Sequence, residues 1–315
     1  MFDIVSKRYY YFALSLLIII PGLVAMIYSV VQFGTPVRLS IDFTGGAMLE
    51  LQFEEPVQPA DVRQAFVELG YLDTAVQTTA DARTVLIRSK PLDSETKDLI
   101  KNKLKDTLGP LIELRFESVG PTIGHEVTSA ATVAVVVAAL VILTFIIFAF
   151  RKVPNAFRYG VCAIAAMVHD ILVAMGLFSL FGLILGWEVD ALFLTAILTV
   201  TGFSVQDTIV VFDRIRENIP RRRGEPFETI VNRSLLETLH RSLATQLNAI
   251  FVLIAILLFG GATIKQFIVV LLIGLFSGTY SSIFNAVPLL VVWENAEIGR
   301  FFRRLFKGGE ARAAA

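Results

Sequence analysis

The fold follows from one stretch, Thr201-Gly-Phe-Ser-Val-Gln-Asp-Thr-Ile-Val-Val-Phe-Asp-Arg-Ile-Arg-Glu-Asn218. It begins as an apolar segment typical of a membrane helix and ends as a charged segment typical of an aqueous one. Asp207 lies inside the apolar part, six residues before Asp213, where the charges begin. An ionisable side chain is costly in hydrocarbon, so such a residue is a functional-site hypothesis by default.

The composition indicates an integral membrane protein. Of the 315 residues, 55% are hydrophobic, and the mean hydropathy is +0.68. The formal net charge is zero, so the chain lacks the basic surface expected of a nucleic-acid-binding protein. The single cysteine, Cys162, excludes an internal disulfide and a cysteine-based metal cluster. Because His125, His169 and His240 show no metal-ligand spacing, we expect neither a metal nor a cofactor.

Six apolar runs have the length of about 20 residues that a helix needs to cross a membrane. The first, Phe12–Val31, exceeds the roughly 7–15 apolar residues of a cleaved signal peptide, so we expect it to remain as an anchor. The other five are Thr128–Phe150, Val161–Trp187, Leu192–Phe212, Leu243–Gly261 and Phe267–Trp293. The small-residue pairs Gly182/Gly186 and Gly274/Gly278 predict close helix contacts.

Basic residues predict the orientation, because Lys and Arg gather in cytoplasmic loops. They recur in the second and fourth connections and in the C-terminal tail, whereas the third connection has none and the fifth has only Lys265. We therefore expect a multi-pass protein of the cytoplasmic membrane with both termini inside. The predicted regions are 1–33 (N-terminus and first span), 34–126 (extracytoplasmic domain), 127–295 (spans two to six, with a cytoplasmic loop 213–241) and 296–315 (cytoplasmic tail).

The extracytoplasmic region shows alternating and helical patterns. The predicted strands are Ala47–Phe53, Ala75–Thr79, Thr84–Arg88 and Ile112–Val119, with a turn at Asp81, and the predicted helices are Pro59–Leu69 and Ser94–Leu108, the second capped by Ser94. The order strand-helix-strand-strand-helix-strand is ferredoxin-like (βαββαβ). The fold class is thus an α-helical membrane protein with six spans plus one α+β ferredoxin-like domain. This domain has no evident pocket chemistry, so we predict a binding module rather than an enzyme.

The sequence also indicates the structure of two connecting segments. Ser118–Gly124 contains two glycines and a proline, which suit either a hinged connection to the membrane or a plain turn. Glu225–His240 places Ile230, Leu235 and Leu239 among polar residues. That pattern predicts an amphipathic helix on the membrane surface.

Polar side chains recur at one depth in three spans. The third span contains His169 and Asp170, the fourth contains Asp207, and the fifth begins at Arg241 and continues to Gln246. At ~1.5 Å of rise per residue, these groups fall in the inner half of the membrane. A carboxylate whose proton is exchanged as its access changes is the recurring design of membrane proton relays.

Structural alternatives remain for each of these residues. Arg241 is either the counter-charge of Asp207 or an interfacial anchor that extends to the membrane surface. His169 and Asp170 suit an interhelical pair with a packing role, and Asp207 could join helices by hydrogen bonds. The charged group Asp213–Glu217 is expected to form a solvated helix face with local ion pairs.

Three motifs resemble those of the SecF family of protein-export membrane proteins. They are Ile41-Asp-Phe-Thr-Gly-Gly46, Gly202–Asn218 and Glu237-Thr-Leu-His-Arg-Ser242. The resemblance covers nearly the whole chain. It departs at Gln206, where the family usually has Asn, and in the fifth span, where more Ser and Thr are expected.

The resemblance implies membership of the resistance-nodulation-division superfamily and pairing with SecD to give twelve spans. Further implied partners are the SecYEG channel, YajC and translocating polypeptides. The implied role is to use protons as the coupling ion for late translocation steps, after the ATP-driven SecA motor. Asp207 is then the functional carboxylate and Arg241 the functional arginine, with His169 and Asp170 as secondary candidates for the proton path. Two rivals are a purely structural subunit that stabilises SecD and half of a proton-coupled small-molecule exporter.

Overall fold

The structure, a computed structural model, describes residues 3–78, 82–151, 155–261 and 264–295. The expected turn at Asp81, the end of the second strand at Thr79 and the tail 296–315 lie outside these residues. The chain divides into two compact units. One unit, called the external unit after the location predicted for it, comprises Leu39–Val133 together with Glu188–Ala191, and the helical unit contains the other described residues.

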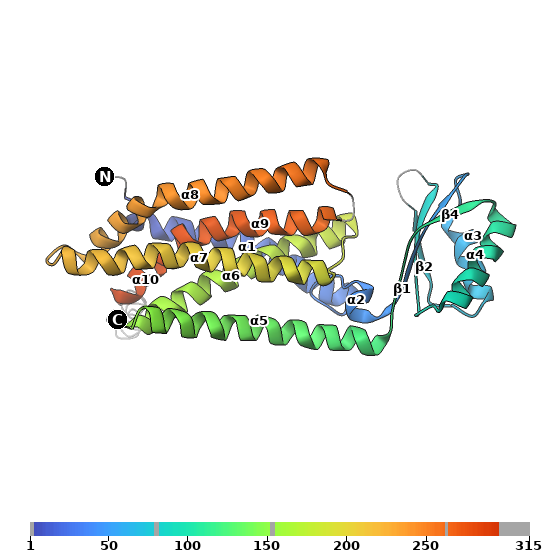
Figure 1. Cartoon of the computed structure of the whole chain (residues 1–315), viewed down its shortest axis with the longest axis horizontal. Helices are drawn as coiled ribbons and strands as arrows, with labels where there is room; N and C mark the ends of the chain where they lie inside the picture. Colours follow the sequence, from blue (N-terminus) through green and yellow to red (C-terminus); the bar gives the residue numbers. More distant parts are fainter. Residues whose placement is uncertain (1–2, 79–81, 152–154, 262–263, 296–315) are drawn as a thin grey trace, which may run out of the picture. The chain divides into compact units, whose positions relative to one another are not determined.

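The external unit has the predicted βαββαβ order. Its elements are β1 (Gly46–Phe53), α3 (Pro59–Glu68), β2 (Ala75–Thr78), β3 (Thr84–Ser89), α4 (Ser94–Leu108) and β4 (Leu111–Val119). The strands pair antiparallel in the order β2-β3-β1-β4, with α3 and α4 on one face of the sheet (Figure 1). Alternate β1 residues, Leu49, Leu51 and Phe53, are buried in one core with Phe66 of α3 and Ile100 of α4. The structure therefore confirms the ferredoxin-like domain that the alternation in the sequence predicted.

The predicted cap of the second helix was wrong by one residue. Asp93, not Ser94, precedes α4, and its carboxylate accepts a hydrogen bond from the backbone N–H of Thr96 at 2.8 Å. Ser94 is the first helical residue. Both Asp and Ser are good N-terminal caps. The negative charge of the Asp93 carboxylate also interacts favourably with the positive end of the helix dipole.

The motif around Gly45 and Gly46 forms one helical turn, α2 (Ile41–Thr44), which leads directly into β1. Both glycines have positive φ angles, +71° and +128°. The turn also packs closely against α5 (Pro121–Ala149). A Cβ atom on Gly124 would lie 2.8 Å from the backbone N of Gly45 and the backbone O of Phe43. Glycine here permits close packing of two backbones.

This packing argues against the hinge considered for Ser118–Gly124. β4 ends at Val119, and α5 begins at Pro121 and continues without a break to Ala149. Only Gly120 separates the two elements. Proline suits the first turn of a helix because its missing N–H would have no intrahelical partner there.

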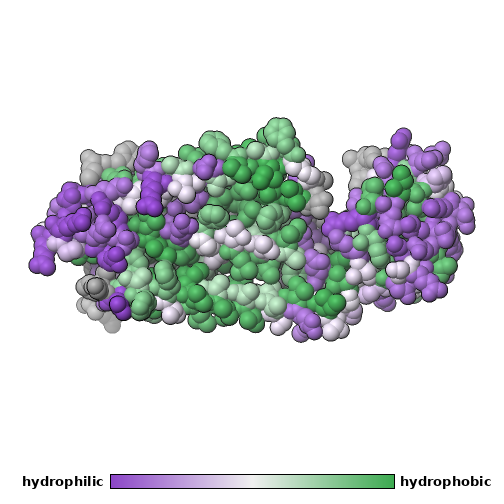
Figure 2. Space-filling model, viewed as in Figure 1, coloured by the Kyte–Doolittle hydropathy of each residue, from purple (hydrophilic) through white to green (hydrophobic). Residues whose placement is uncertain are grey.

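The helical unit contains six helices long and apolar enough to span a membrane among the described residues, which confirms the predicted number. They are α1 (Arg8–Phe33, after a short 3-10 turn), α5, α6 (Ala156–Leu185), α7 (Ala191–Arg221), α8 (Phe227–Phe259), and a last span formed by α9 (Lys265–Ser281), a π-helical turn (Ser282–Ala286) and α10 (Val287–Glu294). Figure 2 shows mainly hydrophobic residues along this bundle and hydrophilic ones where α7 ends and α8 begins.

The segment 213–241, predicted as the connection between the fourth and fifth spans, is mainly helical, because α7 continues to Arg221 and α8 begins at Phe227. The surface helix predicted at Glu225–His240 is not a separate helix but part of α8. Val231 and Leu235 are buried in the same cluster as Phe212 of α7, and Ile230 is buried too. The apolar stripe seen in the sequence therefore faces the bundle.

Glycines allow the closest helix contacts. A Cβ atom on Gly278 of α9 would lie 3.0 Å from the Cβ of Ser204 of α7, and one on Gly274 would collide with Val200. This pair was predicted from its spacing. The sequence analysis did not predict a second close contact, between Gly22 of α1 and Gly176 of α6. An added Cβ on either glycine would come within 2.8 Å of the opposite Cα.

We predict that Gly124→Ala lowers the stability of the chain by about 1–3 kcal/mol, because the added methyl group overlaps the backbone of Phe43 and Gly45. Gly120→Ala is the matched control, since a Cβ there meets no atom within 4 Å and should change stability by less than about 0.5 kcal/mol. Thermal unfolding in detergent measures both. Equal effects of the two substitutions would contradict the packing role of Gly124.

Candidate functional site

Asp170 of α6 is the most enclosed carboxylate among the described membrane helices, with 1% of its surface exposed. Its Oδ2 accepts hydrogen bonds from the hydroxyls of Ser204 at 2.5 Å and Ser281 at 2.7 Å. Its Oδ1 accepts one from the hydroxyl of Ser277 at 2.6 Å and lies 3.1 Å from Nδ1 of His169. One carboxylate thus binds α6 to α7 and α9.

These four contacts use the whole acceptor capacity of a carboxylate, which offers about four lone-pair positions and no donor when ionised. In this arrangement Nδ1 of His169 donates to Asp170. Nε2 of the same ring is buried and has no hydrogen-bond partner in the described part of the chain. The ring stacks on Tyr280, with centroids 6.1 Å apart, and the Tyr280 hydroxyl donates to the backbone O of Tyr11 at 2.6 Å.

The π-helical turn lies immediately after Ser281. Pro288 follows it, and its ring excludes the normal helical hydrogen bond and collides with the carbonyl four residues earlier. A locally wider turn accommodates this. In that turn the Asn285 side chain exchanges hydrogen bonds with Ser15 of α1, at 2.8 and 3.1 Å. The last span is therefore fixed to α1 within the π-helical turn and to Asp170 just before it.

Asp207 of α7 is also buried, with 6% exposed, but it has fewer partners. The amide Nε2 of Gln246 of α8 donates to its Oδ2 at 2.8 Å. The Ser242 hydroxyl lies beside the same carboxylate without an aligned hydrogen bond. Oε1 of Gln246 is likewise buried without a partner among the described residues. Asp207 therefore keeps acceptor positions that Asp170 has filled.

Of the two roles considered for Arg241, the counter-charge of Asp207 is not observed, because the two side chains form no ion pair within the described chain. Arg241 is exposed, and no hydrogen bond or ion pair connects the two side chains. Ser242 and Gln246 are four residues apart and share the face of α8 that meets α7, whereas Arg241 and Thr245 share the next face and are exposed. The depth of Arg241 was predicted, but its direction around the helix was not.

Polar side chains are exposed on both of these helices. In α7 they include Thr199 and Gln206, and in α8 they include Arg241, Thr245 and Asn248. The two threonine hydroxyls bond to carbonyls of their own helices. The other three side chains make no hydrogen bond or ion pair within the described residues. Polar groups in membrane helices normally face protein or water, so this surface is suited to contact with another protein.

Local ion pairs stabilise the end of α7, as predicted. Arg216 pairs with Asp213 at 2.5 Å, and Arg214 pairs with Glu217 at 2.8 Å. Arg214 also pairs with Glu237 of α8 at 2.5 Å. The charged face therefore joins the two helices as well as meeting solvent.

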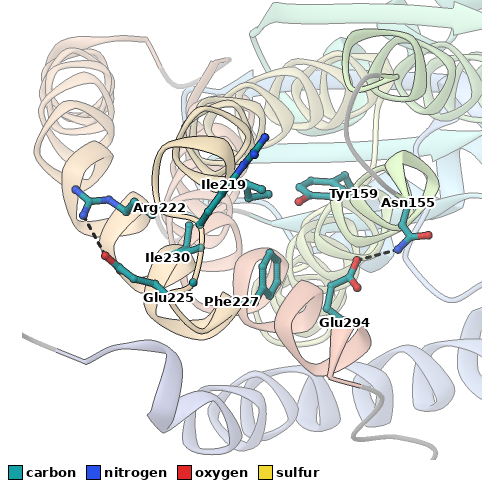
Figure 3. A pocket seen from close by; sticks show the side chains of 10 residues that line it. Asn155, Tyr159, Ile219, Arg222, Glu225, Phe227, Ile230 and Glu294 are labelled. Atoms are coloured by element: carbon teal, nitrogen blue, oxygen red, sulfur yellow. Dashed lines mark hydrogen bonds and ion pairs between the residues drawn. The ribbon is translucent and has the colours of Figure 1, made fainter.

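A cavity of about 420 Å³ lies at the same end of the bundle. Its wall includes Tyr159, Phe227 and Ile230, and Figure 3 shows the charged side chains at its margin. Among them, Arg222 pairs with Glu225 at 3.3 Å, and Glu294 pairs with Arg158 at 2.7 Å. The described residues contain no group of three or more His, Cys, Asp or Glu side chains that could hold a metal ion.

The comparisons with known proteins agree with this architecture. A family model described as "Protein export membrane protein SecD/SecF, C-terminal" matches residues 99–296, and one described as "SecD/SecF GG Motif" matches residues 30–57. The chain is 50% identical to the protein translocase subunit SecF of Anaerolinea thermophila, over 99% of this chain and 100% of that protein. It is 52% identical to the SecF subunit of Thermobaculum terrenum, over 96% and 98% respectively.

The chain belongs to the SecD/SecF family. A crystal structure of SecDF from Thermus thermophilus superposes with a TM-score of 0.77 at 33% identity, over 93% of this chain and 39% of that one. SecDF in its super-membrane-facing form gives 0.66 at 32%, over 96% and 40%. This chain thus spans about two fifths of those SecDF chains. Like its relatives, it is a multi-pass membrane subunit of the protein translocase, a transport component.

The matched regions contain the residues singled out above. The GG-motif region includes α2, and the C-terminal region includes Asp170, Asp207 and Arg241. Sequence reasoning missed Ser277 and Ser281. Their four-residue spacing in an otherwise apolar span was the available signal, because it places both hydroxyls on one helix face.

We predict that Ser281→Ala destabilises the chain by about 1–3 kcal/mol, since it leaves one acceptor position of buried Asp170 unfilled. The matched control is Thr144→Ala. This threonine is exposed on α5, and its hydroxyl bonds only to the carbonyl of Leu140 in its own helix. Thermal unfolding in detergent distinguishes the two variants. A Ser281→Ala protein as stable as the control would mean that Asp170 does not fasten the bundle.

Proposed function

We propose that the chain acts with SecD to use the proton gradient for late steps of polypeptide translocation, with Asp207 as the proton-exchanging carboxylate. The observation that supports this best is the contrast between two buried carboxylates. Asp170 has four hydrogen-bond contacts, whereas Asp207 has one aligned donor beside buried polar atoms that lack partners. A group that exchanges a proton must be accommodated in both its forms.

Gln246 is chemically suited to both forms of Asp207. Its amide carries two N–H donors and one carbonyl acceptor. The N–H donates to the ionised carboxylate, as at the 2.8 Å contact. After protonation, the new O–H of Asp207 needs an acceptor, and the partnerless Oε1 of Gln246 can supply it after rotation of the amide. Neither form then requires a buried ion pair.

His169 and Asp170 are assigned a secondary place in the proton path. Asp170 bonds Ser204, which precedes Asp207 by three residues on α7, so the pair holds the exchanging group at a fixed depth. The partnerless Nε2 of His169 is a further site at which a proton could be held. The gradient supplies about 2.3 kcal/mol per charge for each 100 mV. Since ~1.4 kcal/mol is a factor of ten, this biases an equilibrium roughly fifty-fold.

SecD is the proposed partner of the exposed polar surface on α7 and α8. Its helices would cover Gln206, Arg241 and Asn248 and complete a twelve-span assembly. Arg241 would then lie at the interface and act on Asp207 through groups that SecD contributes, including a carboxylate of its own. SecYEG, YajC and translocating polypeptides are the further proposed partners of this assembly.

The proposed orientation places both termini in the cytoplasm and residues 34–126 outside the inner membrane. The distribution of basic residues supports it, since Arg158 and the arginines at the end of α7 lie at one end of the spans. With this orientation, Asp207 lies nearer the cytoplasmic side and the ferredoxin-like domain meets emerging chains.

We predict that Asp207→Asn abolishes proton-dependent export and proton flux in vesicles containing the reconstituted SecD complex, while the complex still assembles. The amide has nearly the shape of the carboxyl but cannot exchange a proton. Asp213→Asn is the matched control, because Asp213 lies on the same helix at the charged surface and pairs locally with Arg216. It should retain the wild-type flux.

Other results distinguish the rivals. A purely structural subunit predicts a weaker complex in Asp207→Asn with no specific loss of flux. A small-molecule exporter predicts proton flux coupled to a solute instead of to a polypeptide. Full proton-dependent export by Asp207→Asn contradicts the proposal.

A further inference from the structure

The cavity of about 420 Å³ at the end of the helical bundle is bordered by residues of α6, α7, α8 and α10. Its apolar wall consists of Tyr159, Ile219, Phe227 and Ile230. A packed protein interior leaves few voids larger than a water molecule, and an apolar void offers water no hydrogen-bond partners. The cavity therefore suits an apolar occupant.

The charged side chains at the margin of this cavity are mostly paired within the bundle. Arg222 pairs with Glu225 at 3.3 Å, and Glu294 pairs with Arg158 at 2.7 Å. In Figure 3 the Arg222–Glu225 pair and Glu294 lie on opposite sides of the apolar side chains. The fourth lining charge, Arg223, is exposed and makes no ion pair within the described residues. A charged ligand is therefore a poorer match to this cavity than an apolar one.

The described chain ends at the margin of the same cavity. Glu294 is the last residue of α10, and it lines the cavity. The next residue, Asn295, donates a hydrogen bond from its side-chain amide to Glu228 of α8 at 2.5 Å. Residue 296 therefore follows directly from a fixed point beside the cavity.

The sequence that follows has regularly spaced apolar residues. Between positions 298 and 306 they recur at intervals of three or four, as Ile298, Phe301, Phe302, Leu305 and Phe306. A helix places residues with this spacing on one face. Six residues lead from Asn295 to Phe301; they span ~9 Å as a helix and at most ~20–22 Å when extended. Both conformations bring the phenylalanines within reach of the cavity that Glu294 lines.

We propose that segment 298–306 folds back on the bundle and places the side chains of Phe301 and Phe302 in this cavity. The rings then pack on Tyr159 and Phe227, and aromatic pairs gain more than their buried area alone provides. The basic residues between the apolar ones stay in water. The docked segment joins the end of the last span to α6, α7 and α8. This inference does not depend on the proposed function, because it requires no proton exchange at Asp207.

A segment with alternating apolar and basic residues also suits the surface of an anionic membrane. The observations favour the cavity, because it is apolar, its marginal charges are mostly paired, and the segment starts beside it. The two locations differ in their dependence on anionic lipid, which the test uses.

The first test is disulfide cross-linking in the full chain, reconstituted in vesicles. Phe227→Cys with Phe302→Cys should form a disulfide several-fold faster than Phe227→Cys with Arg304→Cys. Position 304 is two residues further along the chain but lies on the opposite face of the predicted helix. Cys162 is buried and is kept, and the single-cysteine variants control for its reaction. The rate should be the same in phosphatidylcholine vesicles with and without phosphatidylglycerol.

Two results of this experiment overturn the proposal. Equal rates for the two cysteine pairs mean that the segment is not seated in the cavity. A rate for the Phe302→Cys pair that falls when phosphatidylglycerol is added assigns the segment to the membrane surface.

The second test needs no cysteines. Phe301→Ser with Phe302→Ser should lower the thermal unfolding temperature of the full chain in detergent by several degrees, because the cavity loses its occupant. Arg303→Ser with Arg304→Ser is the matched control from the opposite face and should leave it unchanged. An unfolding temperature that the phenylalanine substitutions do not alter contradicts the docking.

Discussion

The helical unit depends on the burial of one carboxylate with all its acceptor positions filled. An unsatisfied charge at Asp170 would cost several kcal/mol in an apolar bundle, whereas hydroxyls from Ser204, Ser277 and Ser281 satisfy it. Their short reach requires the helices to approach closely. Gly278 permits this at the position of Ser204. The hydrogen bonds to Asp170 and the close packing of the helices therefore support each other. Together they fix the rotation of α7 relative to α6 and α9.

That rotation determines what Asp207 meets. Ser204 and Asp207 are separated by less than one helical turn, so holding Ser204 against Asp170 directs Asp207 toward Gln246 and Ser242 of α8. On one side of α7, Ser204 bonds the fully hydrogen-bonded carboxylate of Asp170, and on another side Asp207 has only one aligned donor. The Ser204–Asp170 contact suits a fixed point in the bundle, and Asp207 suits a change of protonation.

Much of this architecture could be predicted from patterns of two kinds. Alternation in Ala47–Phe53 and helical spacing in Pro59–Leu69 revealed the βαββαβ order, because each element buries one regular face. Run length identified the six spans, and the cost of a buried carboxylate identified Asp207. These signals depend on distance along the chain, which the sequence determines directly.

Direction and neighbours could not be predicted from the sequence. Similar depth made Arg241 a candidate counter-charge of Asp207, with an interfacial anchor as the alternative, yet Ser242 and Gln246 occupy that face of α8. Depth does not determine the angle around a helix. The segment Glu225–His240 was assigned to the membrane surface, but an apolar stripe does not reveal whether lipid or a neighbouring helix covers it. Likewise, the pattern in Ser118–Gly124 suited either a hinge or a plain turn, whereas the role of Gly124 depends on the backbone of Phe43 and Gly45, far away in sequence.

If the proposed function is right, Asp207 gains and loses a proton while Gln246 accommodates both forms. Infrared difference spectroscopy on the SecD complex in vesicles, comparing acidic with alkaline conditions, tests this exchange most directly. We expect a protonated-carboxyl C=O band of Asp207 in the wild-type complex and in Asp213→Asn, and its absence in Asp207→Asn. We also expect the band to shift in Gln246→Leu, which removes the hydrogen-bonding amide. A carboxyl band that persists unchanged in Asp207→Asn would contradict proton exchange at Asp207.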